Sequence, residues 1–327
     1  MPDHPASPLF DVLDVHPAGS PGDAAVDVFT GPNLMHWRRR LFGGQVLGQV
    51  AVAAGRTVGT DRVLHSLHAY FLRPGDPAVP VAFAVERLRD GRSFSARRVQ
   101  ATQNGVPILS GIASFQTPAE GLDHAEPAPD VPDPEDVVSD YAVLDASDHP
   151  LAHQLGRGRH VELRHVEPTL YAAPDPEHRA RQSVWFRLDA PLPGDDLVQR
   201  GALAYASDLS ILEPVLRRNG LAWATPGMNV ASLDHAMWWH RPARADEWIL
   251  YAAESPNASG ARGLATGRMY DRQRRLVATV AQEGMVRVND SNPGGRDGDA
   301  QSRVSLRYVT RCGRAASGPR RATLFCS

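Results

Sequence analysis

The stretch DDLVQRGALAYASDLSILEPVLR, residues 195–217, is the segment from which the fold can be worked out. Its small and apolar residues recur every three or four positions, which is the spacing of one helix face. Asp208 falls on the same face, where a carboxylate is costly unless it is paired or hydrogen-bonded. Pro214 is expected to kink or end the helix in its last turn. The segment therefore predicts a helix that carries either a satisfied structural aspartate or a catalytic one.

An earlier stretch, LFGGQVLGQVAVAAGRTV at residues 41–58, predicts a second helix. Gly44, Gly48, Ala51 and Gly55 form a stripe of very small residues along it. Each glycine costs a helix about 1 kcal/mol relative to alanine. Four small residues in phase therefore indicate that another backbone approaches this face closely, as when a sheet wraps around a helix.

Strand-like segments follow each of these helices. After the first helix they cover residues 64–72, 79–88, 93–103 and 106–116. Asn104-Gly105, between the last two, is a strong signal for a two-residue hairpin. After the second helix they cover residues 230–240, 248–254, 261–270 and 276–288, and two more strands are expected before it, at 161–168 and 182–188.

The two halves of the chain match each other. Paired landmarks lie 168 residues apart, and the order of helix and strands is the same in both halves. These landmarks are Arg73-Pro74 with Arg241-Pro242, Glu86 with Glu254, and Ile108 with Leu276. A fixed offset of this kind indicates an internal duplication.

The duplication predicts two similar domains, residues 1–117 and 161–288. The segment between them, 118–160, begins with a stretch rich in proline and acidic residues and is interpreted as a linker. Residues 289–327 are rich in arginine and small residues and show little periodicity, so we expect a disordered tail.

Composition excludes several classes of function. The formal charge of the 327 residues is -2, which gives no sign of a nucleic-acid partner. No apolar run approaches the length of a membrane span, and the N-terminus lacks the pattern of a secretory signal, so we expect a cytoplasmic protein. The two cysteines, Cys312 and Cys326, lie in the tail, and the chain contains no lysine. A catalytic thiol in the body of the chain and lysine Schiff-base chemistry are therefore not expected.

The motifs of the chain resemble those of type II acyl-CoA thioesterases. In the first half they are FGGQVLGQ, HSLHAYFLRPGD, VERLRDGRSFSARRVQATQNG and ASFQ. In the second half AYASDLS, SLDHAMWWHRP, EWILYAAESP, SGARG and QEGMVR follow in the same order. The resemblance covers about residues 10–288. It implies an α+β double hotdog, in which two tandem repeats each have a long helix wrapped by a curved antiparallel sheet.

The resemblance also implies hydrolysis of fatty acyl-CoA to free acid and CoA, without a metal, a cofactor or a covalent intermediate. Its catalytic aspartate, hydroxyl residue and glutamine fall on Asp208, Ser232 and Gln282, which would jointly position a water. Residue patterns support two of the three, because Asp208 is the polar exception on its stripe and Gln282 shares a strand face with apolar residues. A satisfied core amide is the alternative for Gln282, and Ser232 has no independent signal. Family members tend to form homo-oligomers, tetramers among them.

Further residues are candidates for binding the substrate. Gly43 and Gly44, near the start of the first helix, are candidates for supplying a backbone N–H to an oxyanion, although the sequence does not place that N–H. Arg97, Arg98 and Arg262 are candidate contacts for the CoA phosphates, and His65 is a candidate binding residue. The histidine spacings match no common metal site.

Two other functions remain open at this point. A hotdog-type enoyl-CoA hydratase would rely on an aspartate–histidine pair, but Asp234 and His235 are neighbours that would face opposite sides of a strand. A non-catalytic acyl-CoA binding protein is the third possibility, and the presence of all three candidate catalytic residues argues against it. The preferred acyl length does not follow from the sequence.

Overall fold

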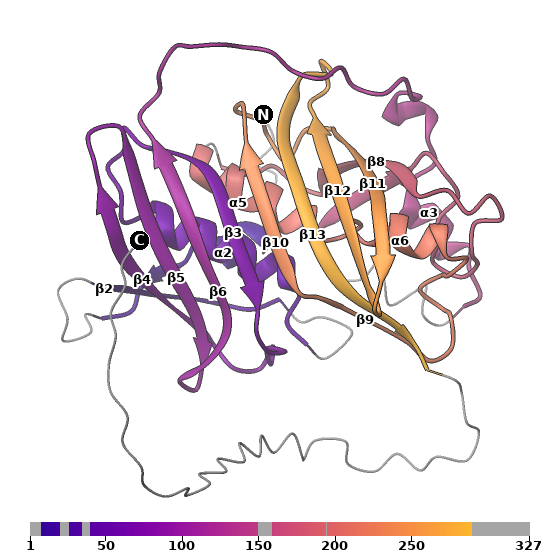
Figure 1. The fold of residues 1–327 in the computed structure, drawn as a ribbon, viewed down its shortest axis with the longest axis horizontal. Helices are drawn as coiled ribbons and strands as arrows, with labels where there is room; N and C mark the ends of the chain where they lie inside the picture. Colours follow the sequence, from indigo (N-terminus) through magenta and orange to yellow (C-terminus); the bar gives the residue numbers. More distant parts are fainter. Residues whose placement is uncertain (1–7, 20–25, 35–39, 150–158, 194, 290–327) are drawn as a thin grey trace, which may run out of the picture. The chain divides into compact units, whose positions relative to one another are not determined.

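The computed structural model describes residues 8–19, 26–34, 40–149, 159–193 and 195–289. A 13-stranded antiparallel sheet curves around two helices that pack against each other on one of its faces, α2 (Gly43–Gly55) and α5 (Asp196–Ser207) (Figure 1). A short helix, α1 (Pro8–Leu13), buries three apolar side chains near both. None of the helices in the described ranges combines the length and apolarity that a membrane span requires.

The strands of each half lie together in the sheet. In the first half they are β1 (His16–Pro17), β2 (Val26–Gly31), β3 (Val63–Phe71), β4 (Val81–Asp90), β5 (Phe94–Gln103) and β6 (Val106–Gln116). In the second half they are β7 (Val161–His165), β8 (Arg181–Leu188), β9 (Met228–Ser232), β10 (Asp234–Trp239), β11 (Ile249–Ser259), β12 (Arg262–Tyr270) and β13 (Leu276–Val288). The order across the sheet is β1-β2-β4-β5-β6-β3-β10-β13-β12-β11-β8-β7, with β9 paired to β13.

The hairpin predicted at Asn104-Gly105 is confirmed. It joins β5 to β6, and both turn residues have positive φ, 50° and 76°. Such a turn matches the right-handed twist of the flanking strands. The asparagine and glycine are there because they adopt this conformation at low cost.

The two halves meet edge to edge at β3 and β10. These strands pair antiparallel, with Ala69 opposite His235 and Leu67 opposite Met237. The N–H of Phe71 also donates to the carbonyl of Leu233 at 2.9 Å. Main-chain hydrogen bonds therefore continue one sheet across both halves, and the region around Leu233 lies at the joint.

The glycine stripe faces α5. A Cβ at Gly44 would lie 2.3 Å from the carbonyl oxygen of Tyr205, and one at Gly48 would lie 2.7 Å from that of Gly201. The predicted close approach of another backbone is therefore confirmed, but the neighbour is a helix from the other half. Two helices this close leave no room for a β-carbon, which explains why glycine is needed at these positions.

The single helix expected over residues 195–217 is wrong. The helix α5 ends at Ser207, a turn follows, and a separate helix, α6 (Glu213–Arg218), begins five residues after Asp208. Pro214 lies in the first turn of α6, where its missing N–H costs nothing because that group would have no helical partner. Asp208 is consequently the C-cap residue of α5 and not part of a continuous stripe.

The single strand expected over residues 230–240 is also wrong, because it divides at Leu233. The two pieces pair with different parts of β13: β9 with residues 284–288 and β10 with residues 278–281. Leu233 donates its N–H to the carbonyl of Glu283 at 2.9 Å. The break therefore lies beside Gln282 and sets Ser232 at a strand end.

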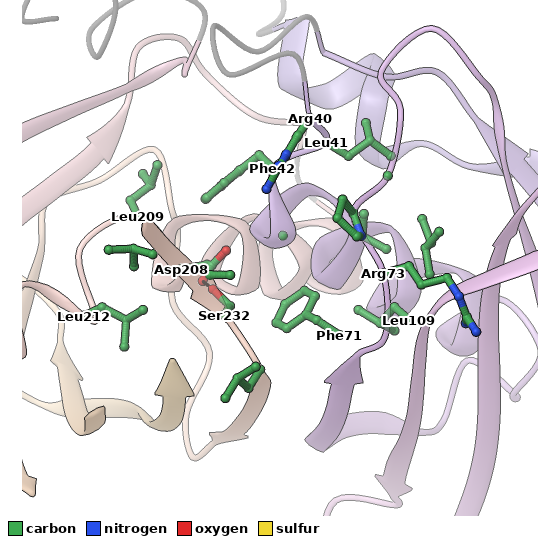
Figure 2. Close-up of a pocket in the computed structure, with 18 of the residues that line it drawn as sticks. Arg40, Leu41, Phe42, Phe71, Arg73, Leu109, Asp208, Leu209, Leu212 and Ser232 are labelled. Atoms are coloured by element: carbon green, nitrogen blue, oxygen red, sulfur yellow. Dashed lines mark hydrogen bonds between the residues drawn. The ribbon is translucent and has the colours of Figure 1, made fainter. Parts of the chain in front are cut away.

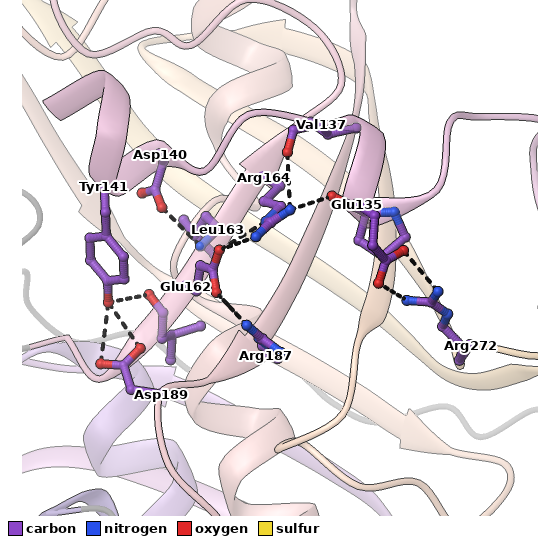
Figure 3. Close-up of polar contacts among 12 residues, drawn as sticks. Glu135, Val137, Asp140, Tyr141, Glu162, Leu163, Arg164, Arg187, Asp189 and Arg272 are labelled. Atoms are coloured by element: carbon purple, nitrogen blue, oxygen red, sulfur yellow. Dashed lines mark hydrogen bonds and ion pairs between the residues drawn. The ribbon is translucent and has the colours of Figure 1, made fainter. Parts of the chain in front are cut away.

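The predicted linker contains structure in its described part. A 3₁₀ turn, η1 (Pro134–Asp136), and a helix, α3 (Asp140–Asp145), contact the strands of the second half (Figure 3). Glu135 forms a two-pronged ion pair with Arg272, and Asp140 accepts the N–H of Leu163 at 3.0 Å. The boundaries at 117 and 161 remain predictions. Residues 150–158 and the predicted tail from 290 onward lie outside the described residues.

Candidate active site

Three elements of the second half bring Asp208, Ser232 and Gln282 together. Asp208 follows α5, Ser232 ends β9, and Gln282 lies on β13 beside the break between β9 and β10. The hydroxyl of Ser232 donates to Asp208 Oδ1 at 3.0 Å. Gln282 Nε2 donates to the same carboxylate oxygen and to Ser232 Oγ, each at 2.9 Å. Two breaks that the sequence did not predict bring these residues together: the end of α5 at Ser207 and the division of the strand at Leu233.

A cavity of about 410 Å³ opens at this cluster. Asp208 and Ser232 line it (Figure 2). Gln282 is fully buried and is not part of the lining. Apolar side chains from both halves of the chain form its walls on either side of Asp208. They include Phe42, Phe71, Leu109, Leu209, Leu212 and Val230. The cavity is therefore largely apolar around Asp208 and Ser232, and Tyr171 and Glu213 also contribute to its lining.

Burial changes the acidity of Asp208. Removal from water raises the pKa of its carboxyl from 3.8 to about 6, because the charged form loses solvation. Hydrogen bonds from Gln282, from Ser232 and from the backbone N–H of Gly44 oppose this rise, since they stabilise the anion. The resulting group is ionised near neutrality and still basic enough to accept a proton.

The glycines at the start of α2 reach this carboxylate from the other half. Gly44 donates its N–H to Asp208, and Gly43 lines the cavity. A Cβ on Gly43 would lie 2.7 Å from Asp208 Oδ2 and 2.9 Å from the ring of Phe71. The first N–H groups of a helix lack intrahelical partners and favour negative charge. The α2 terminus is therefore an electropositive wall of the site.

Two of the candidate arginines do not line the cavity. Arg97 is 1% exposed, and its guanidinium pairs with Asp90 at 2.7 Å and bonds Thr57 at 2.8 Å. Arg98 is exposed and pairs with Glu86. Both charges thus have acidic partners inside the first half, which the sequence pattern did not reveal.

Arg262 and His65 also lie away from the cavity. Arg262 pairs with Glu283 at 3.0 Å across neighbouring strands, and His65 Nε2 lies 2.9 Å from Ser114 Oγ. Three other arginines line the cavity, Arg40, Arg73 and Arg159. The buried Arg159 pairs with Asp140, whereas Arg40 and Arg73 are exposed and were missed as substrate-binding candidates. Their signals were present: Arg40 ends the basic run before α2, and Arg73 is a landmark of the repeat.

Asp234 and His235 face opposite sides of β10. Asp234 Oδ1 accepts the N–H of Glu283 at 2.8 Å, whereas His235 is buried and contacts Gln282 and Ser207. The two side chains therefore form no aspartate–histidine pair. Within the described ranges, histidine, cysteine and carboxylate side chains form no group of three that could hold a metal.

Comparison with known proteins indicates which family the chain belongs to. Residues 34–116 match the family model described as acyl-CoA thioesterase N-terminal domain, and residues 170–285 match the one described as acyl-CoA thioesterase. Acyl-CoA thioesterase 2 of Haemophilus influenzae is 37% identical over 269 residues, covering 80% of this chain and 93% of that protein. Acyl-coenzyme A thioesterase 8 of Mus musculus is 41% identical over 265 residues, covering 76% and 81%.

A solved structure extends the agreement to three dimensions. The acyl-CoA thioesterase II TesB2 of Mycobacterium marinum is 38% identical and superposes with a TM-score of 0.69, covering 86% of this chain and 98% of that one. The tesB protein of Mycobacterium avium subs paratuberculosis has the same TM-score at 31% identity. The sheet, its two helices and the order of its strands are those of a double hotdog. The chain therefore belongs to the type II acyl-CoA thioesterase family.

Proposed function

We propose that this protein hydrolyses acyl-CoA thioesters, with Asp208 as the general base for an attacking water. The observation that carries the proposal is the cluster of Asp208, Ser232 and Gln282 at an apolar cavity, where the pKa of the aspartate is raised to about 6. Membership of the thioesterase family supports the reaction class. A base whose pKa lies near the working pH combines a useful ionised fraction with good proton affinity.

The proposed reaction needs one water and no covalent intermediate. Asp208 takes a proton from the water, and the oxygen of that water attacks the thioester carbonyl carbon. Ser232 orients the water. The N–H of Gly43, at the start of α2, stabilises the oxyanion that forms. Collapse of the tetrahedral intermediate breaks the carbon–sulfur bond, and the proton passes from Asp208 to the leaving thiolate. Gln282 acts from behind by holding both Asp208 and Ser232.

The remaining lining residues suggest how the substrate is held. The apolar walls on either side of Asp208 suit the acyl chain and the pantetheine arm. Arg40 and Arg73 are exposed at the same cavity and would meet the anionic phosphates of CoA. Release of free thiol from acyl-CoA, followed with a thiol reagent, tests the reaction. Loss of absorbance from an enoyl-CoA without thiol release would instead show a hydratase.

We expect Ser232→Ala and Gln282→Ala to lower kcat non-additively. Each residue holds the same oxygen of Asp208, so removing either already misplaces the carboxylate and its water. The double variant should therefore be only slightly slower than the slower single variant, with little change in KM. Independent sites would instead add within about 0.3–0.5 kcal/mol, and additivity in folded proteins would reject the shared role.

We expect hydrolysis to fall as the pH drops through about 6. The base works only when ionised, and burial raises the pKa of Asp208 to about 6. Activity should therefore be full above this pH and decline tenfold per unit below it. The measurement is kcat/KM between pH 4.5 and 8.5, with circular dichroism at each pH to exclude unfolding. Activity that stays nearly full down to pH 4.5, as expected for an ordinary aspartate that titrates near pH 4, would contradict the raised pKa.

A further inference from the structure

The hydrogen bonds of Gln282 leave its carbonyl oxygen to a histidine that has no place in the mechanism above. Gln282 gives both amide hydrogens away, one to Asp208 and one to Ser232. Its Oε1 lies against the Nδ1 nitrogen of His235. Both side chains are buried, at 0% and 1% exposure, so no solvent is at hand to replace either partner.

The orientation of the Gln282 amide matters for the site. Turned by half a rotation, the amide would direct its carbonyl oxygen at the Asp208 carboxylate and at Ser232 Oγ. Two acceptors facing each other repel, and the carboxylate would lose one of its three donors. The two orientations of the Gln282 amide have nearly the same shape. A hydrogen-bonding neighbour is therefore needed to select the orientation that directs the amide nitrogen at Asp208.

His235 can make that selection only in one tautomer. A neutral imidazole carries one N–H, and the opposite nitrogen is an acceptor. A hydrogen on Nδ1 is donated to Gln282 Oε1 and fixes the amide, whereas a hydrogen on Nε2 would leave two acceptors in contact. Burial lowers the pKa of His235 to about 4, which keeps the ring neutral at physiological pH.

Ser207 lies where it can hold this tautomer. Its Oγ is 2.9 Å from His235 Nε2 and 2.7 Å from the carbonyl oxygen of Ala204. The hydroxyl has a single hydrogen, which can go either to the Ala204 carbonyl or to Nε2. The contact between Nδ1 and Gln282 Oε1 requires that the hydrogen go to Nε2, which is then the acceptor. Ser207 is also the residue directly before Asp208, so its position is fixed by the same helix end.

We propose that His235 is a positioning residue, and that a directed relay from Ser207 through His235 to Gln282 sets the amide that holds Asp208 and Ser232. With the Ser207 hydrogen turned from the Ala204 carbonyl to His235 Nε2, every donor in this relay points toward the carboxylate. Successive hydrogen bonds of this kind strengthen one another. The inference rests on the proposed hydrolysis. The proposal adds a residue that acts on the general base through two successive hydrogen bonds and does not contact the substrate.

The first test compares two replacements of His235. Asparagine places an amide nitrogen near the position of Nδ1 and keeps the donor, whereas leucine has similar bulk and removes it. We expect His235→Asn to retain most of kcat and His235→Leu to lose about 10- to 100-fold, because a buried acceptor is then unsatisfied. KM should change little in both. Equal kcat for both variants, with folding shown by melting curves, would overturn the proposal.

The second test separates the relay from general support of the core. In the Gln282→Ala background, His235→Leu should cause no further fall in kcat, because the histidine acts only through the glutamine. A further fall of the same size as in the wild-type background would show a purely structural role. If Gln282→Ala itself keeps wild-type kcat, the proposed catalytic cluster is wrong. If Gln282→Ala is slow but His235→Leu is not, only the proposed role of His235 is wrong.

The third test reads the tautomer without any assay. In protein labelled with nitrogen-15 at histidine, the ring signals of His235 should show Nδ1 protonated and Nε2 bare, with the assignment made by their loss in His235→Asn. Ser207→Ala should shift these signals toward the other tautomer and lower kcat to a value between those of wild type and His235→Leu. A wild-type ring protonated at Nε2 would overturn the proposed direction of the relay.

Discussion

Asp208→Asn is expected to keep the fold and to lose hydrolysis by about 10²- to 10⁴-fold, the range over which a general base contributes. Asparagine has nearly the same shape, and its carbonyl oxygen can still accept from Ser232 and Gln282. It cannot take a proton from water at neutral pH. The measurement is steady-state thiol release from an acyl-CoA, together with a melting curve for each protein.

A surface aspartate provides the matched control for this change. Asp61 is 65% exposed and lies in the turn that leads into β3. Asp61→Asn removes the same charge from the chain and should leave kcat unchanged. Near wild-type turnover by a folded Asp208→Asn protein would remove Asp208 from the mechanism. A loss shared by both variants would trace the effect to net charge.

Gly48→Leu is expected to destabilise the protein by about 3 kcal/mol or more, because overpacking at a backbone contact cannot be relieved by a side-chain rotation. A Cβ at Gly48 would already lie 2.7 Å from the carbonyl of Gly201 and 2.6 Å from a methyl of Leu13. The larger side chain would have to separate α2 from α5. Denaturant unfolding followed by circular dichroism measures the loss, and activity should fall with it because α2 supplies one wall of the site.

Gly121 is the control for this second change. It lies in an exposed segment, and a Cβ there would meet nothing within 4 Å. Gly121→Leu should unfold at the wild-type denaturant concentration. Equal stability of the Gly48→Leu and Gly121→Leu proteins would show that the two helices are not held at the distance that the glycines permit.

Much of the fold follows from periodicity and turn chemistry. Hydrophobic spacing and the Asn104-Gly105 signal located most strands and α2, and the glycine stripe correctly indicated a close backbone neighbour. The identity of that neighbour did not follow, since contact between distant segments leaves no local trace. The end of α5 was missed because Ile211, Leu212 and Val215 continue the apolar spacing of the helix before them. Spacing alone could therefore not show that the backbone leaves the helix.

The candidate site was found by pattern and resemblance together, and each contributed something different. Asp208 was singled out as a polar exception on a helical stripe, although the structure places it at the helix end instead. Ser232 had no local signal, since its role depends on the break at Leu233. Arg97 and Arg98 were chosen for their charge, but charge alone says nothing about partners across the sheet, and both have acidic neighbours there.

The repeat has a consequence for reaction stoichiometry. At the offset of 168 residues, Leu64 and Ser114 occupy the positions of Ser232 and Gln282, so the first repeat lacks the proposed catalytic set. It instead contributes the start of α2 to the site of the second repeat. In the proposed mechanism two scaffolds thus serve one reaction centre, and titration with a non-hydrolysable thioester analogue should saturate at one equivalent bound per chain.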